Sequence, residues 1–166
     1  MTQYLLDANV FIAAKNLHYG FDFCPAFWDW IIREHAAGNV MSIERVYGEL
    51  QAGDDDLARW AAQRGSSFFL RPDASVIPEL GSVSNWANSQ SYEPAAVSTF
   101  LQVADFYLVA QARAGGHTVV THERPDAFRR KTIKIPDACI ALGIHHVTPF
   151  EMLRRERARF TLGPNG

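Results

Sequence analysis

The chain has 166 residues, of which 48% are hydrophobic and 20% are charged, and this composition predicts one fully folded domain with a core of ordinary size. No apolar run approaches the roughly 18 residues of a membrane span, and Asp7 and Asn9 interrupt the first apolar run, so we expect neither a membrane helix nor a signal peptide. Cys24 and Cys139 lie far apart without a CxxC partner, which argues against a disulfide framework or a zinc site and favours a reducing cytoplasm.

The charges are unevenly distributed along the chain. Residues 1–123 carry seven Lys or Arg against fourteen Asp or Glu, whereas residues 124–166 carry nine against four. An acidic body beside a basic C-terminal part suits a carboxylate-rich site next to a surface that attracts polyanions. The alternative is that the last arginines only form the solvated face of a final helix; these are Arg154, Arg155, Arg157 and Arg159.

The apolar stretch Tyr4–Ile12 opens with a predicted strand that runs directly into Asp7. Apolar side chains on both faces are typical of a strand in the middle of a parallel sheet. Asp7 would then lie at the carboxyl end of the strand, where open α/β sheets bind their ligands. Asn9 would begin a helix that runs to about Leu17. The alternative is that Asp7 or Asn9 only caps this helix.

Helices and strands alternate along the next part of the chain. Pro25 is well placed to open a helix, and Ser42 fits the N-cap of another, in which Glu49 borders the apolar face. Residues 66–70 form a short strand or a buried loop. The helices predicted in this part cover residues 26–37, 43–50, 54–63 and 74–86.

The second half of the chain continues the alternation. Pro94 opens a helix that runs, with a possible kink, to about Ala110, and a buried strand over residues 117–121 leads to His122 and Glu123. Thr148 and Glu151 form a capping box for the final helix. The remaining predicted segments are a helix over 137–142, a strand over 144–147 and a frayed tail over 161–166. This order predicts an α/β domain over residues 1–160, with three α/β/α layers around a short, mostly parallel sheet.

Four carboxylates stand against apolar sequence: Asp7, Glu49, Asp105 and Glu123. An isolated ionised carboxylate in such surroundings costs several kcal/mol. If the four converge, their repulsion raises their pKa values unless a cation lies between them. Hard oxygen ligands favour Mg²⁺ or Mn²⁺. His122, next to Glu123, is interpreted as structural or as a minor substrate contact.

The segments that hold these acids resemble PIN-domain ribonucleases. They read YLLDANVFI, ERVYGEL, ADFYLVAQA and HTVVTHE, and they are most similar to VapC-type toxins and to a related uncharacterised bacterial branch. The closing segment KIPDACIALGIHHVTPFEML is similar to the end of that branch, so the resemblance runs from Tyr4 to about Leu153.

The resemblance implies a Rossmann-like PIN topology with an acidic metal site. Asp7, Glu49 and Asp105 match the triad that holds the metal, and Glu123 matches a fourth acid that is Asp in many members. Asn9 and Thr121 match polar residues that orient the ligands, and His122 stands beside them. Asp137 is a further acid that either turns inward or only opens a short helix after Pro136.

The implied function is a Mg²⁺-dependent endoribonuclease, the toxin of a bacterial toxin–antitoxin pair. Toxins of this kind are held by an antitoxin and often form homodimers. Basic residues that would hold the RNA backbone are Lys15, Arg45, Arg129, Arg130 and Lys131, besides the C-terminal arginines. Two alternatives remain: a non-catalytic PIN-like module that binds RNA or protein, and a Mg²⁺-dependent phosphatase with Asp7 as nucleophile. A phosphatase of this kind has a second Asp two residues after the nucleophile, and this chain has Asn9 there, which counts against the phosphatase.

Overall fold

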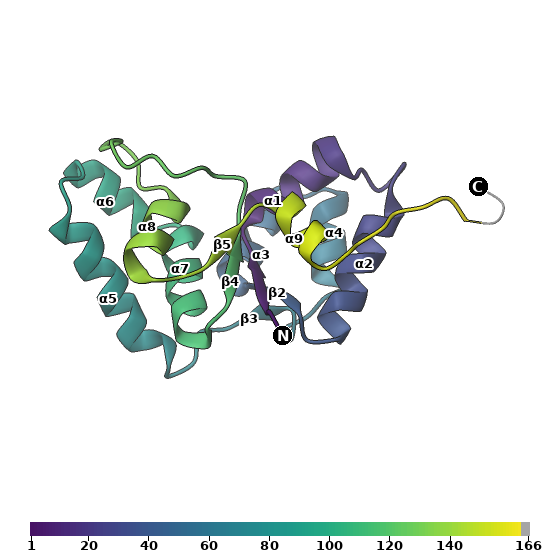
Figure 1. The fold of residues 1–166 in the computed structure, drawn as a ribbon, viewed down its shortest axis with the longest axis horizontal. Coiled ribbons are helices and arrows are strands. Elements are labelled where there is room, and N and C mark those ends of the chain that lie inside the picture. The colour runs from purple at the N-terminus through teal and green to yellow at the C-terminus, as the bar shows by residue number, and fades with distance from the viewer. Residues whose placement is uncertain (164–166) are drawn as a thin grey trace.

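A central parallel sheet organises residues 1–163, which are the residues that the computed structural model describes (Figure 1). The strand order is β3-β2-β1-β4-β5, and every pair of neighbours is parallel. Leu5 of β1 pairs with Met41 of β2 on one side and with Val119 of β4 on the other. The strands are β1 Tyr4–Leu6, β2 Val40–Ile43, β3 Phe69–Leu70, β4 Thr118–Val120 and β5 His146–Val147. The predicted α/β class and parallel sheet are therefore confirmed.

Helices cover both faces of this sheet, which gives the predicted three layers. In Figure 1, α5, α6, α7 and α8 lie on one side of the sheet and α2, α4 and α9 on the other. The helices are α1 Ala8–Ala13, the π-helix η1 Ala14–His18, α2 Pro25–Ala36, α3 Glu44–Ala52, α4 Asp56–Ala62, α5 Val76–Ser89, α6 Pro94–Phe100, α7 Ala104–Gly115, α8 Ile135–Leu142 and α9 Pro149–Arg155.

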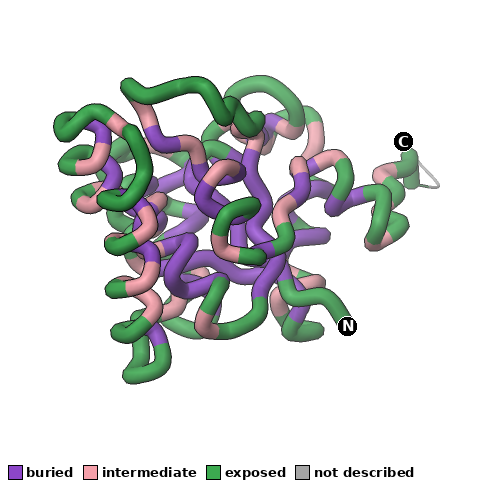
Figure 2. Tube along the Cα trace, turned by 60° about the vertical axis from the view of Figure 1, so that its left-hand side comes forward, coloured by how far each residue is buried: buried purple, intermediate pink, exposed green. Residues whose placement is uncertain are grey.

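The core is built around β1, as its sequence predicts. Tyr4, Leu5 and Leu6 are each no more than 1% exposed, because β2 and β4 cover the two edges of the strand and helices cover its two faces. Figure 2 shows the buried segments in the centre of the molecule and the exposed segments along the outer turns and loops. The same core extends to the place where α1 meets the residue before β3, with the Phe11 ring 6.1 Å from that of Phe68.

Two local predictions need correction. Ser42 does not cap a helix, because it lies in β2 with its side chain buried, and its hydroxyl donates a 2.6 Å hydrogen bond to the carbonyl oxygen of Leu6. Ile43 takes the N-cap position of α3 instead. The helix predicted from Pro94 is two helices, since Val103 is extended between α6 and α7. The predicted first helix is confirmed in its extent, and its second part, from Ala14 to His18, is a π-helix.

The capping box of α9 is confirmed, because Thr148 Oγ1 accepts from Glu151 N–H while the Glu151 carboxylate accepts from Thr148 N–H. Residues 161–163 have no regular secondary structure, and residues 164–166 of the predicted frayed tail lie outside the described residues.

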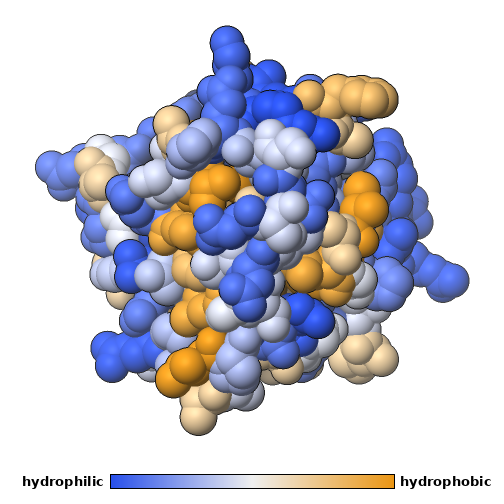
Figure 3. All heavy atoms as spheres, turned by 90° about the vertical axis from the view of Figure 1, so that its left-hand side faces the viewer, coloured by the Kyte–Doolittle hydropathy of each residue, from blue (hydrophilic) through white to orange (hydrophobic). Residues whose placement is uncertain are grey.

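No helix in the described part combines the length and apolar character that crossing a membrane requires. The side formed by α5, α6 and α8 shows apolar patches among polar residues (Figure 3).

Candidate active site

Asp7 is the most buried of the four carboxylates. It follows β1 directly, its backbone N–H donates to the carbonyl oxygen of Val120 at 3.0 Å, and its residue is 6% exposed. It occupies the N-cap position of α1 without capping the helix through its side chain. Instead, Oδ2 accepts a 3.1 Å hydrogen bond from the hydroxyl of Thr121, which follows β4. The strand pairing of β1 with β4 thus brings an acid and its donor together across the sheet.

Burial, and then the charges of Glu123 and Glu49, raise the pKa of Asp7 from 3.8 to about 7. The hydrogen bonds from Thr121 and from the backbone of Ala8 act in the opposite direction. The acid is therefore poorly compensated within the protein, because two hydrogen bonds do not offset lost hydration and two neighbouring negative charges. Among the described residues, no Lys or Arg forms an ion pair with the Asp7 carboxylate.

Asp105 stands in the first turn of α7 and is half-buried. Its pKa is also raised from 3.8 to about 7, first by burial and then by the charges of Asp7, Glu123 and Glu49, whereas Lys134 lowers it. The fold thus brings the four acids close enough to repel one another. Asp7 and Glu123 follow the carboxyl ends of β1 and β4, where parallel α/β folds place their ligands, and Glu49 and Asp105 lie in α3 and α7.

Glu49 and Glu123 lie at the edge of this group. Glu49 is an exposed residue of α3; loss of hydration at its carboxyl end raises its pKa, and the backbone N–H of Ala104 lowers it. Glu123 has a second role, because its Oε2 accepts a 2.7 Å hydrogen bond from the backbone N–H of Ile135, at the start of α8. The Glu123 backbone N–H donates to Thr121 Oγ1 at 3.1 Å. Thr121 therefore joins Asp7 to Glu123.

The donor set fits a hard divalent cation by its chemistry, since all four groups offer carboxylate oxygens. As the side chains stand, no three His, Cys, Asp or Glu residues among those described form a group around one ion position. Mg²⁺ commonly uses one or two carboxylates and keeps several of its waters. Asp7 and Asp105, the two carboxyl groups whose pKa values are raised to about 7, are the pair best suited to hold it.

The two other polar residues that the sequence singles out contact different partners. Asn9 is exposed and, within residues 1–163, its side chain makes no hydrogen bond to protein. The Asp7 carboxylate is therefore oriented by the Thr121 hydroxyl and the backbone of Ala8, and not by Asn9. The His122 ring packs 5.6 Å from that of His18 and 5.7 Å from that of Phe150. Burial, and then the charge of His18, lowers the pKa of His122. Sequence reasoning missed His18, because no local signal places η1 beside the end of β4.

Two of the predicted RNA-binding cations already have partners within the protein. Lys15 Nζ lies 2.8 Å from Oδ2 of Asp55, the N-cap residue of α4. The Arg45 guanidinium carbon lies 4.1 Å from the ring centroid of Tyr107. Both cations fix the packing of neighbouring helices, and an RNA backbone would have to compete for them.

The segment between β4 and α8 carries three more of the predicted cations. Arg129 and Lys131 are exposed, and the Arg130 guanidinium carbon lies 5.6 Å from the ring centroid of Tyr92. Asp137 does not turn toward the acidic group, since both of its carboxylate oxygens accept from the backbone N–H of Asp126, each at 3.1 Å. It holds this segment against the start of α8.

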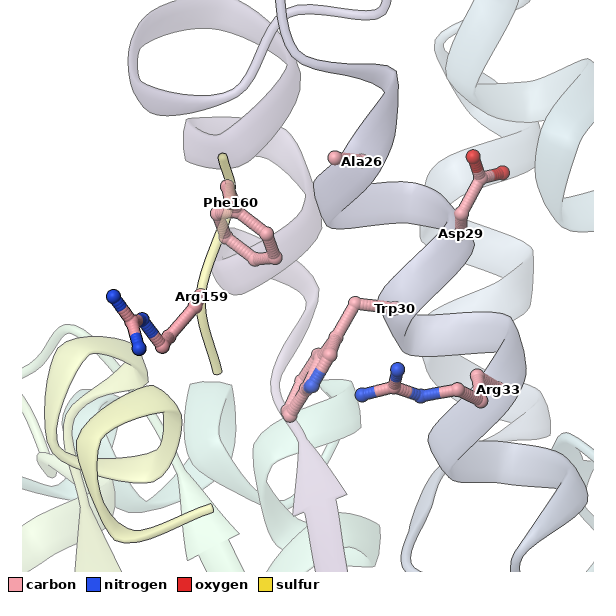
Figure 4. A pocket seen from close by; sticks show the side chains of 6 residues that line it. All are labelled: Ala26, Asp29, Trp30, Arg33, Arg159 and Phe160. Atoms are coloured by element: carbon pink, nitrogen blue, oxygen red, sulfur yellow. The ribbon is translucent and has the colours of Figure 1, made fainter. Parts of the chain in front are cut away.

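Two cavities differ in their relation to the four acids. One of about 250 Å³ lies between α2 and the C-terminal segment, where Figure 4 shows Trp30 between Phe160 and Arg33. None of the four carboxylates lines it. A cavity of about 160 Å³ lies between α6, the start of α7 and residues 131–133, and Asp105 forms part of its wall. Only the smaller of these two therefore adjoins the candidate site.

Comparison with known proteins places the chain in a family without assigning a function to it. A family model described as a domain of unknown function (DUF4411) matches residues 4–160, which is nearly the whole chain. No curated protein and no solved structure matches the chain.

Proposed function

We propose that this chain, which belongs to the DUF4411 family of unknown function, is a metal-dependent endoribonuclease of the PIN-domain type. The observation that carries the proposal is the buried Asp7 carboxyl, whose pKa is raised to about 7 beside the charges of other acids from separate elements. A protein gains no stability from such an arrangement at neutral pH, so a bound cation is its simplest physical justification. The proposed reaction, hydrolysis of RNA, is taken from the resemblance of the four acid-bearing segments to PIN-domain ribonucleases.

In this proposal Asp7 and Asp105 hold the cation, and Glu49 and Glu123 complete the negative field around it. Thr121 keeps the Asp7 carboxylate in one orientation through its 3.1 Å hydrogen bond. Lys134, whose charge already acts on Asp105, and the exposed Lys131 attract the phosphates of the RNA. A divalent cation, when bound, supplies Lewis-acid stabilisation for the hydrolysis of a phosphodiester bond.

The biological setting is also part of the proposal and rests on the resemblance alone. It comprises action as the toxin of a toxin–antitoxin pair in the cytoplasm, control by an antitoxin protein, and a possible homodimer. The choice of Mg²⁺ or Mn²⁺ follows from the oxygen donors.

Cleavage of a labelled RNA pool with a random central region tests the proposal. Wild-type protein is compared in Mg²⁺, in Mn²⁺ and in chelator with the variants Asp7→Asn and Asp105→Asn. Because loss of a partner of a metal ligand already costs about 10–100-fold, we expect each variant to lose more than about 100-fold. Asp29→Asn is the matched control, since Asp29 is exposed on α2 and does not belong to the acidic group.

Three results would overturn the proposal. Wild-type protein that leaves the RNA intact with either metal would remove the enzymatic function and favour a module that only binds RNA or protein. Cleavage by Asp7→Asn at the wild-type rate would assign the activity to a contaminant. Release of phosphate from small monoesters, with intact RNA, would point instead to a phosphatase.

A further inference from the structure

The cavity of about 160 Å³ beside Asp105 is the strongest unassigned feature of the molecule. It is considerably smaller than the roughly 300–1,000 Å³ sites that enclose drug-sized ligands, so it has room for a single ring system. One of its walls is α6 and the opposite wall is residues 131–133. The lining residues that matter here are Ala96, Thr99, Phe100, Asp105, Lys131 and Thr132.

The lining combines apolar surface with polar groups. Ala96 and Phe100 are 6% and 3% exposed and contribute apolar surface, and the Phe100 ring is held edge-on against the Phe106 ring at 5.9 Å. Thr99 and Thr132 bring hydroxyl groups that both donate and accept hydrogen bonds. A nucleobase has the complementary surface, with apolar faces and hydrogen-bonding edges.

Both walls of the cavity are fixed before any ligand arrives. The backbone N–H of Glu93, next to the start of α6, donates to the carbonyl oxygen of Arg130 at 2.9 Å. Arg130 also places its guanidinium over the Tyr92 ring. These contacts tie the segment before α8 to the residues before α6. A preformed cavity binds its ligand with little loss of conformational entropy.

We propose that this cavity binds one nucleobase of the RNA, immediately beside the phosphodiester bond that is cut, and so selects the cleavage site. The inference rests on the proposed ribonuclease function, because Asp105 belongs both to the cavity wall and to the acidic group. The exposed Lys131 at the cavity attracts the phosphate attached to that base. Ala96 matters because its small side chain leaves the space that the base enters.

The test uses the full chain with two variants and a matched control. Ala96→Leu fills the cavity from α6. Thr132→Val removes one hydroxyl without changing the side-chain volume much, which keeps the test valid if Ala96→Leu does not fold. Ala95→Leu is the control, because Ala95 is exposed on the same helix and does not line the cavity. Circular dichroism checks that each protein is folded.

The first measurement is equilibrium binding of the four nucleoside 5′-monophosphates and of inorganic phosphate in the absence of metal. We expect one nucleotide to bind better than phosphate. Ala96→Leu should weaken the binding of that nucleotide about 10-fold or more, as loss of a stacked base does. Ala95→Leu should leave its affinity unchanged. Equal binding of phosphate and all four nucleotides would overturn the inference, because the cavity would then take only the anion.

The second measurement maps the cleaved bonds in the random RNA pool. Wild-type protein should prefer one base at a fixed position beside the cut, and both cavity variants should lose that preference while Ala95→Leu keeps it. Cleavage whose base preference survives in both cavity variants would overturn this inference and leave the ribonuclease function standing. Selective nucleotide binding that Ala96→Leu abolishes, in a protein that cuts no RNA, would overturn the ribonuclease function and leave the base site standing.

Discussion

Replacing Asp7 by Asn is expected to stabilise the metal-free protein at high pH. The pKa of Asp7 is about 7 in the folded protein against its ordinary 3.8, so the folded state binds the proton more tightly than the unfolded chain. The contribution of this group to the free energy of unfolding is therefore full below about pH 4 and is lost as the pH rises from there through 7. At about 1.4 kcal/mol per pH unit, the ionised group costs roughly 4 kcal/mol at pH 8, as an upper limit.

Asparagine removes this cost, because it does not ionise and still offers an oxygen to the Thr121 hydroxyl. We expect Asp7→Asn to raise the free energy of unfolding at pH 8 by up to about 4 kcal/mol, and by less at pH 5. Urea denaturation in chelator at both pH values measures the difference. Asp29→Asn, with the same change of charge on an exposed residue, should stay within about 0.5 kcal/mol of wild type.

Two outcomes would refute this reasoning. If Asp7→Asn is less stable than wild type at pH 8 without metal, the carboxylate is a structural group with adequate partners. If the free energy of unfolding of wild type does not fall between pH 5 and pH 8, Asp7 is not buried as the structure places it.

Three further predictions concern metal binding at Asp7, the Thr121 hydroxyl and the Tyr4 hydroxyl. Millimolar Mn²⁺ should raise the melting temperature of wild type and leave that of Asp7→Asn unchanged; an equal rise in both proteins would place the metal elsewhere. Thr121→Val should cost about 1–3 kcal/mol in urea denaturation, because the hydroxyl donates to Asp7 and accepts from the Glu123 backbone; a neutral effect would contradict this role. Tyr4→Phe should cost about 1–2 kcal/mol, since the Tyr4 hydroxyl donates to Glu156 at 2.7 Å; an unchanged urea midpoint would show that this bond contributes nothing.

The sequence predicted the sheet well where burial on both faces leaves a local signal. β1 and β4 have apolar side chains on both faces and are followed by polar residues. The sequence therefore predicted both of them as buried strands of a parallel sheet. β2 was missed as a strand because Ser42 looks like a helix cap. Only the neighbouring strand supplies the Leu6 carbonyl that accepts from its hydroxyl.

The acids of the candidate site stand out in the sequence, whereas most of their contacts do not. Asp7 and Asp105 stand out as acids in apolar sequence, and the fold places them within electrostatic reach of each other. The bond from Ile135 N–H to Glu123 and the ion pair of Lys15 with Asp55 depend on segments that meet only after folding. No periodicity or motif within a single segment contains such information.

The most direct test of the central claim is the anomalous scattering of Mn²⁺ in crystals of the protein. We predict a Mn²⁺ peak bounded by the carboxylates of Asp7 and Asp105, near the Thr121 hydroxyl, and its loss in crystals of Asp7→Asn. A peak at another place, or no peak in wild-type crystals at saturating Mn²⁺, would contradict the claim that these acids form a divalent cation site.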